Sequence, residues 1–114
     1  GTHLEVDNFR GWNSHWILEA GDFVIQDGEI LNKKFGFQEV FNWRLVNDMP
    51  FYFFRKGQRV GISYNEQFLS LYYHDVVHGM CCGYAANNPR VINNTVSFFG
   101  QRDGVWYYVV VEFN

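Results

Sequence analysis

The sequence predicts a single all-β domain with an antiparallel β-sandwich fold. Aromatic residues make up 20% of its 114 residues, with 12 Phe, 7 Tyr and 4 Trp, and such side chains fit the half-buried surfaces of strands. Short apolar segments alternate with turn residues, and no helical segments separate them. A chain of this length has room for one core. Residues 1–114 are therefore expected to form one sandwich domain.

Turn residues define the first expected strands. A tight hairpin is predicted for residues 23–31, because Asp27-Gly28 accepts the positive φ angles of a type I′ turn. A second hairpin is predicted from strands at 51–54 and 59–64, joined by a slightly longer loop at 55–58. Two antiparallel pairs are thus expected within residues 23–64.

The second half of the chain predicts further strands. Residues 96–99 and 105–113 are expected to pair across the turn at 100–104. The segment 105–111 is apolar at every position, which suits a strand near the middle of a sheet covered on both faces. Between the two halves, residues 65–78 favour a strand, although their apolar spacing also fits a helix. No internal repeat is evident in the sequence.

The segment from Val40 to Leu45 places polar groups within an aromatic strand. Side chains alternate between the two faces of an extended chain, so Asn42 and Arg44 are expected on one face and Phe41, Trp43 and Leu45 on the other. An amide and a guanidinium would then face a ligand, while the aromatic face packs on the core. The alternative is an ordinary half-exposed strand with two solvated polar residues. The predicted core includes Phe41, Trp43, Phe53, Val109 and Val111.

This segment, Val40-Phe41-Asn42-Trp43-Arg44, resembles the His-Phe-Asn-x-Arg strand of galectin carbohydrate-recognition domains. Other segments resemble galectin features in the same order: Gly1-Thr2-His3-Leu4-Glu5-Val6, Met49-Pro50-Phe51 with Gly57, Phe68-Leu69-Ser70-Leu71, and the closing pair at 96–100 and 105–109. The resemblance implies a galectin-like jelly roll. It also implies that Asn42 and Arg44 project from a concave sheet toward galactose.

The chain departs from the galectin pattern at positions that hold the sugar. Val40 stands where galectins have His, and only residues 45–48 fill the interval that in galectins carries a stacking Trp and a Glu-x-Arg pair. Within that interval Asn47 corresponds to a further galectin Asn, and Trp43 is a candidate replacement platform. The candidate ligand-binding residues are thus Asn42, Trp43, Arg44 and Asn47. The missing platform removes about 1 kcal/mol or more of sugar contact.

Two histidines and two cysteines lie close together in the sequence. His74, His78, Cys81 and Cys82 fall within nine positions, but they lack the Cys-x-x-Cys spacing of structural zinc sites. We therefore expect neither a metal nor a cofactor. Adjacent cysteines can pair only through a strained ring, so reduced, buried thiols are expected. These thiols and the galectin resemblance favour a cytoplasmic or non-classically secreted protein.

Charge and motifs narrow the function classes. The formal net charge is −3 and no basic run occurs, so nucleic acid is not an expected partner. The apolar runs are shorter than a membrane-spanning helix, and no nucleophile or phosphate-binding motif is present. The sequence therefore predicts a non-catalytic binding module that contacts a protein partner or self-associates. The alternative is a glycan-binding lectin that uses Asn42 and Arg44.

Overall fold

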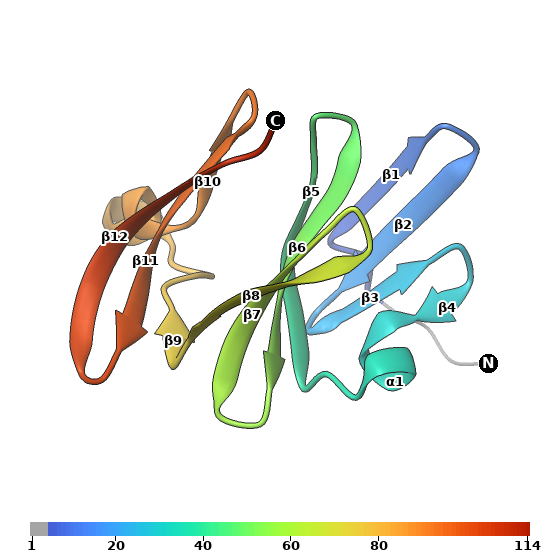
Figure 1. Ribbon diagram of the computed structural model, residues 1–114. Helices are drawn as coiled ribbons and strands as arrows, with labels where there is room; N and C mark the ends of the chain where they lie inside the picture. Colours follow the sequence, from blue (N-terminus) through green and yellow to red (C-terminus); the bar gives the residue numbers. More distant parts are fainter. Residues whose placement is uncertain (1–4) are drawn as a thin grey trace.

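The computed structural model describes residues 5–114 and confirms the all-β prediction. Its strands form three antiparallel sheets that lie side by side in chain order (Figure 1). The N-sheet contains β1 (Asn8–Trp12), β2 (His15–Ala20), β3 (Phe23–Gln26) and β4 (Glu29–Ile30). The M-sheet contains β5 (Glu39–Val46), β6 (Met49–Lys56), β7 (Arg59–Tyr64) and β8 (Gln67–Tyr73). The C-sheet contains β9 (Asp75–Val76), β10 (Arg90–Ile92), β11 (Thr95–Arg102) and β12 (Val105–Glu112).

Only two short helices accompany the sheets in the described chain. The α1 helix (Leu31–Phe35) links the N-sheet to the M-sheet, and the 3₁₀ helix η1 (Cys82–Asn87) lies between β9 and β10. Neither helix is long and apolar enough to cross a membrane. The expected opening strand at residues 1–6 falls mostly outside the described residues.

Each hairpin closes through a two-residue turn whose residues tolerate positive φ. The predicted turn at Asp27-Gly28 is present, with φ angles of 51° and 85°, as expected for a type I′ hairpin. Asn47-Asp48 and Asp103-Gly104 turn in the same way. The loop expected at 55–58 is shorter, because β6 continues to Lys56 and only Gly57-Gln58 remain as the turn.

In the N-sheet and the M-sheet consecutive strands are neighbours, so each of these sheets is a simple meander rather than part of a jelly roll. A two-sheet sandwich is not confirmed, because three sheets are present. The C-sheet differs in one respect: β9 and β10 both pair with β11, as two pieces of one edge strand separated by residues 77–89.

The meanders reveal a repeat that the sequence conceals. The turns at 47–48 and 57–58 in the M-sheet correspond to those at 93–94 and 103–104 in the C-sheet, 46 residues later in both cases. Most side chains differ between the two units, and identical residues recur at only a few positions: Asn42 and Asn88, Arg44 and Arg90, Asn47 and Asn93, Phe53 and Phe99, and Glu66 and Glu112.

The M-sheet is buried on both faces because β6 is apolar on both. Phe51 and Phe53 pack in a cluster with the C-sheet, whereas Tyr52 and Phe54 pack in a second cluster with the N-sheet. Of the predicted core residues, Phe41, Trp43 and Phe53 are buried, and Val109 and Val111 are partly buried against the first cluster. The core therefore consists of two separate layers.

Two expectations about individual segments are corrected by the strand pairing. Residues 67–73 form β8, which pairs with β7, so the helix alternative for 65–78 is wrong. The apolar segment 105–111 lies in β12, which pairs only with β11 and lies at a sheet edge rather than in its middle. The expectation that both faces of β12 are covered is also wrong: only Val109 and Val111 are partly buried, and the other apolar residues of the strand are exposed.

Candidate functional site

A β-bulge in β5 shapes the segment that carries the candidate ligand-binding residues. Phe41 pairs with Phe53, but the next pair joins Arg44 to Phe51, and Asn42 between them has φ of 53°. A bulge inserts an extra residue and re-aims the side chains beside it. Phe41 consequently packs toward the C-sheet and Trp43 toward the N-sheet. The expectation that Phe41 and Trp43 share a face is wrong for this reason.

Asn42 and Arg44 nevertheless line one common cavity of about 280 Å³, which we call the polar cavity. All three sheets or their loops contribute to it: Asn8, Arg10 and Glu19 from the N-sheet, Asn42, Trp43 and Arg44 from β5, and Gly79 and Asn88 from the loop between β9 and β10. At this point β1 of the N-sheet meets β5 of the M-sheet and the loop between β9 and β10 of the C-sheet. Such convergence requires the edges of the outer sheets to approach each other around the M-sheet.

The polar cavity carries two guanidinium groups and one carboxyl group. Burial raises the pKa of Glu19 above its usual range, and the positive charge of Arg44 partly offsets this effect. Within residues 5–114, no carboxylate lies within ion-pair distance of Arg10 or Arg44. Both guanidinium groups therefore keep donors that an anionic or hydroxyl-rich ligand can use.

Of the other two candidate ligand-binding residues, Trp43 lines the polar cavity but is buried, and Asn47 lies elsewhere. Trp43 is only 2% exposed, its indole packs against Trp12 with ring centroids 4.7 Å apart, and its Nε1 donates to Gln26 Oε1 at 3.4 Å. It has no open face on which a sugar could stack. Asn47 forms a turn, and its amide donates to the carbonyl of Phe113 at 2.8 Å. That hydrogen bond links the M-sheet to Phe113, the residue that follows β12.

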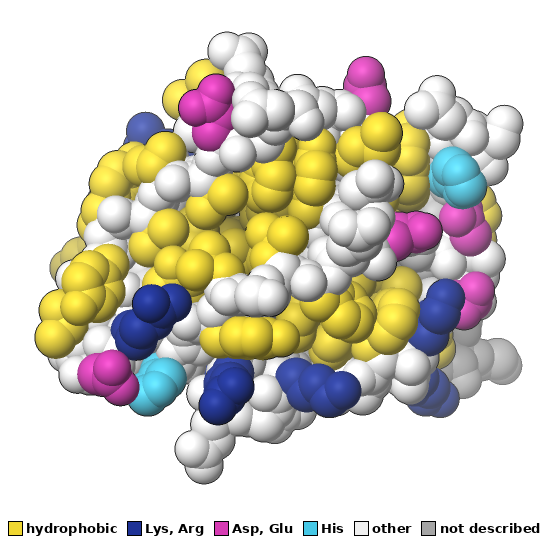
Figure 2. Space-filling view, viewed as in Figure 1, with side chains coloured by type: hydrophobic (Ala, Val, Ile, Leu, Met, Phe, Trp, Pro, Cys, Tyr) yellow, Lys and Arg dark blue, Asp and Glu magenta, His cyan; other side chains and the backbone are white. Residues whose placement is uncertain are grey.

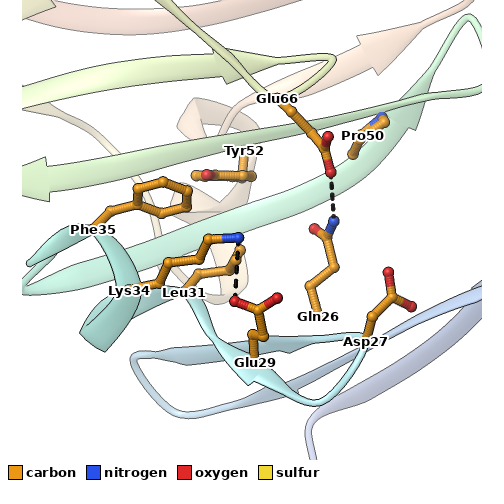
Figure 3. A pocket seen from close by; sticks show the side chains of 9 residues that line it. All are labelled: Gln26, Asp27, Glu29, Leu31, Lys34, Phe35, Pro50, Tyr52 and Glu66. Atoms are coloured by element: carbon orange, nitrogen blue, oxygen red, sulfur yellow. Dashed lines mark hydrogen bonds and ion pairs between the residues drawn. The ribbon is translucent and has the colours of Figure 1, made fainter.

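A second cavity, of about 310 Å³, opens between the N-sheet and the M-sheet (Figure 3). Its polar groups are largely paired with one another: Gln26 Nε2 donates to Glu66 Oε1 at 3.3 Å, and Lys34 Nζ lies 3.2 Å from Glu29 Oε2. Tyr52 forms part of the wall, and burial raises the pKa of its hydroxyl. The third carboxylate of the lining, Asp27, is bonded to His15 and to the backbone N–H of Trp16. Because each charged group already has a partner, this cavity presents no convergent set of free groups to a ligand.

The histidines and cysteines do not assemble into a metal site in the described chain, where no three His, Cys, Asp or Glu side chains gather. His78 Nε2 lies 2.8 Å from Glu39 Oε2, and its ring stacks on Phe41 with centroids 3.5 Å apart. Cys81 and Cys82 are free and exposed, so the expected burial is wrong. A hydrogen bond with Cys81 raises the pKa of Cys82, which disfavours the reactive thiolate.

The outer faces of the two terminal sheets carry several of the exposed large hydrophobic side chains. Residues opposite one another in the pairing share a face, which defines the N-face of the N-sheet as Phe9, Gly11, Trp16, Leu18, Ala20, Phe23, Ile25 and Ile30. The same reasoning defines the apolar part of the C-face of the C-sheet as Ile92, Phe99, Trp106, Tyr108 and Val110. Figure 2 shows hydrophobic side chains at the surface over the β11–β12 end of the molecule.

Several of these side chains are far more exposed than large apolar residues usually are. Phe9 and Tyr108 are each 62% exposed, and Val110 is 58% exposed. Each face contains an aromatic pair: Phe9 stacks on Trp16, and Phe99 contacts Tyr108 with centroids 5.1 Å apart. Sequence reasoning missed both faces because an apolar strand gives no sign of whether a second sheet covers it.

No protein-family model, curated protein or solved structure matches this chain.

Proposed function

We propose that the protein is a non-catalytic binding module that associates with further copies of itself through the N-face and the C-face. The observation that carries this proposal is the uncovered apolar surface of both terminal sheets. Monomeric proteins rarely expose contiguous apolar surface of this kind, and where they do it commonly marks an interaction site.

The M-sheet indicates what such a face does when it meets another sheet. Both faces of β6 are apolar, and both are buried against a neighbouring sheet. The N-face is apolar throughout, and the C-face combines its apolar residues with polar ones, namely Arg90, Thr95, Ser97, Gln101 and Glu112. Within residues 5–114 of a single copy, neither face is covered by a further sheet. Burial of apolar surface stabilises by about 25 cal/mol per Å², so a complementary sheet placed there would gain free energy. Since every position assigned to the N-face is apolar, no charge would have to lose its hydration on that side.

A non-catalytic role is favoured by the state of the reactive groups. His78 is occupied by Glu39 and by the carbonyl of Val76, to which its Nδ1 lies at 2.6 Å. The raised pKa of Cys82 keeps that thiol protonated. These groups therefore lack the activated nucleophile and available base that covalent catalysis requires.

Sedimentation velocity over a range of protein concentrations tests self-association. We expect the wild-type protein to associate, and Tyr108→Lys to weaken association because the lysine places a charge in the C-face. The matched control is Tyr107→Lys: Tyr107 is the adjacent residue on the opposite face of β12 and is 50% exposed. A wild-type protein that stays monomeric at every concentration, or two variants that weaken association equally, would contradict the proposal.

A second candidate function is binding of a hydroxyl-rich ligand such as a glycan in the polar cavity. It is favoured by the gathering of Asn42 and Arg44 with Arg10 there, although the buried Trp43 offers no stacking platform. Titration with a galactoside, followed by amide NMR shifts, tests it. Shifts at Arg10 and Asn42 that vanish in Arg44→Ala would support a sugar site, and unchanged spectra at millimolar sugar would contradict it.

A further inference from the structure

We propose that two copies of the chain stack head to tail, with the N-face of each against the C-face of the other, and so close a ring of six sheets. This inference rests on the proposed self-association and specifies its geometry. A ring of this kind contains two equivalent contacts between copies and leaves neither face uncovered.

The first argument concerns which face of each sheet packs on which neighbour. We call the face that packs on the following sheet in the chain the forward face, and the face that packs on the preceding sheet the backward face. Phe51 and Phe53 define the forward face of the M-sheet, which packs on the following sheet. Ile17 occupies the corresponding face of the N-sheet and packs on the M-sheet. Both internal contacts therefore begin from a forward face.

Both internal contacts also end on a backward face. Tyr52 and Phe54 form the backward face of the M-sheet, which receives the N-sheet, and Val96 and Phe98 form the backward face of the C-sheet, which receives the M-sheet. Phe53 meets Phe98 across the second contact, with ring centroids 5.1 Å apart. The same two kinds of face thus meet at each contact within the chain.

The uncovered faces are one of each kind. Phe99 follows Phe53 by the 46-residue repeat and shares a face with Tyr108, so the C-face is a forward face. Leu18 has the opposite orientation to Ile17, so the N-face is a backward face. A second copy that places its N-face on the C-face would repeat the order of the two existing contacts. A contact between two C-faces would join two forward faces, an order that occurs at neither internal contact.

The second argument concerns closure. A head-to-tail contact extends indefinitely unless rotation from one copy to the next closes a ring. Here the sheets converge at one edge, because residues from β1, from β5 and from the loop between β9 and β10 line the same polar cavity. Sheets that converge at one edge fan apart at the other, and continued fanning leads to a ring. Two copies supply six sheets from three each, within the roughly four to eight four-stranded sheets of closed β-propellers.

Ring closure would also complete the polar cavity. The convergent edges would face the ring axis, so that Arg10 and Arg44 of both copies would surround one central channel. The cavity of a single copy is then one half of a larger polar site, and ligands that bind it would bind the pair more tightly than the single copy.

Complementation between two variants tests this arrangement. The N-face variant is Phe9→Lys with Phe23→Lys, and the C-face variant is Trp106→Lys with Tyr108→Lys; all four wild-type side chains are at least 47% exposed in one copy, so folding should survive. Wild-type protein should sediment at about twice 13.5 kDa and form nothing larger. Each variant alone should be monomeric.

Mixing the variants should produce a one-to-one dimer, because the intact C-face of one variant can bind the intact N-face of the other. With one contact instead of two, this dimer should dissociate about 100-fold more readily than the wild-type pair. Circular dichroism checks folding, and Phe9→Ser and Tyr108→Ser replace any lysine variant that fails to fold.

The outcomes separate the two proposals. If the N-face variant still dimerises by itself, the head-to-tail arrangement is wrong while self-association stands. An open-ended series of wild-type oligomers would likewise refute the closed ring. A wild-type protein that never associates would refute both the ring and the proposed function.

Discussion

Substitution of Phe53 by Ala should destabilise the protein more than almost any other single truncation. Phe53 is completely buried, and its ring lies 5.1 to 5.2 Å from the rings of Phe41, Phe51 and Phe98. Truncation loses the transfer free energy of the ring, about 1.5–3 kcal/mol, and leaves a cavity between two sheets. We therefore expect a loss of about 3–5 kcal/mol in the free energy of unfolding.

Equilibrium urea unfolding at one fixed protein concentration measures this loss, because association would otherwise shift the apparent stability. The control is Phe68→Ala in β8, whose side chain is 46% exposed and should cost less than half as much. An equal loss for the two variants, or a loss under about 1 kcal/mol for Phe53→Ala, would refute the two-layer core.

Three further predictions address the backbone and the polar cavity. Gly61→Ala should cost about 1–3 kcal/mol of unfolding free energy, because a Cβ there would lie 2.5 Å from Cζ of the buried Phe54. The control Gly83→Ala should change little, since no atom lies within 4 Å of its Cβ. Equal effects of the two substitutions in urea unfolding would contradict the packing. At the bulge, Asn42→Val should lower the free energy of unfolding by roughly 1–2 kcal/mol in the same assay, because a left-handed φ penalises a β-branched residue. The control Asn42→Gly should be tolerated. Equal stabilities of the two variants would count against the bulge. Burial raises the folded-state pKa of Glu19, so ionisation of its carboxyl should lower the stability of the protein as pH rises through that pKa. Glu19→Gln should therefore be at least as stable as wild type at pH 7. An NMR titration that returns an ordinary or lowered carboxyl pKa would oppose this.

The sequence was sufficient to predict strands and turns wherever local chemistry determines them. Asp27-Gly28 specifies its hairpin because few residue pairs accept two positive φ angles. Phe41, Trp43 and Phe53 were predicted in the core because aromatic bulk within a strand favours burial. The cost of leaving such rings in water is a property of the residue itself.

Features that depend on neighbours distant in sequence were not predictable. Strict alternation places Phe41 and Trp43 on one face, and only the pairing with β6 reveals the bulge at Asn42 that separates them. The polar cavity joins Arg10 to Arg44 across two sheets, and no local spacing reports that contact. The repeat was hidden because a meander needs turns at fixed intervals but accepts many different apolar side chains between them.

Hydroxyl-radical footprinting of Tyr107 and Tyr108 tests the central claim most directly. These neighbours lie on opposite faces of β12 and are 50% and 62% exposed in a single copy. If the C-face is covered by a second copy, Tyr108 should become protected as protein concentration rises, while the oxidation rate of Tyr107 stays nearly constant. Oxidation rates of both residues that do not depend on concentration, or that fall equally, would contradict the account.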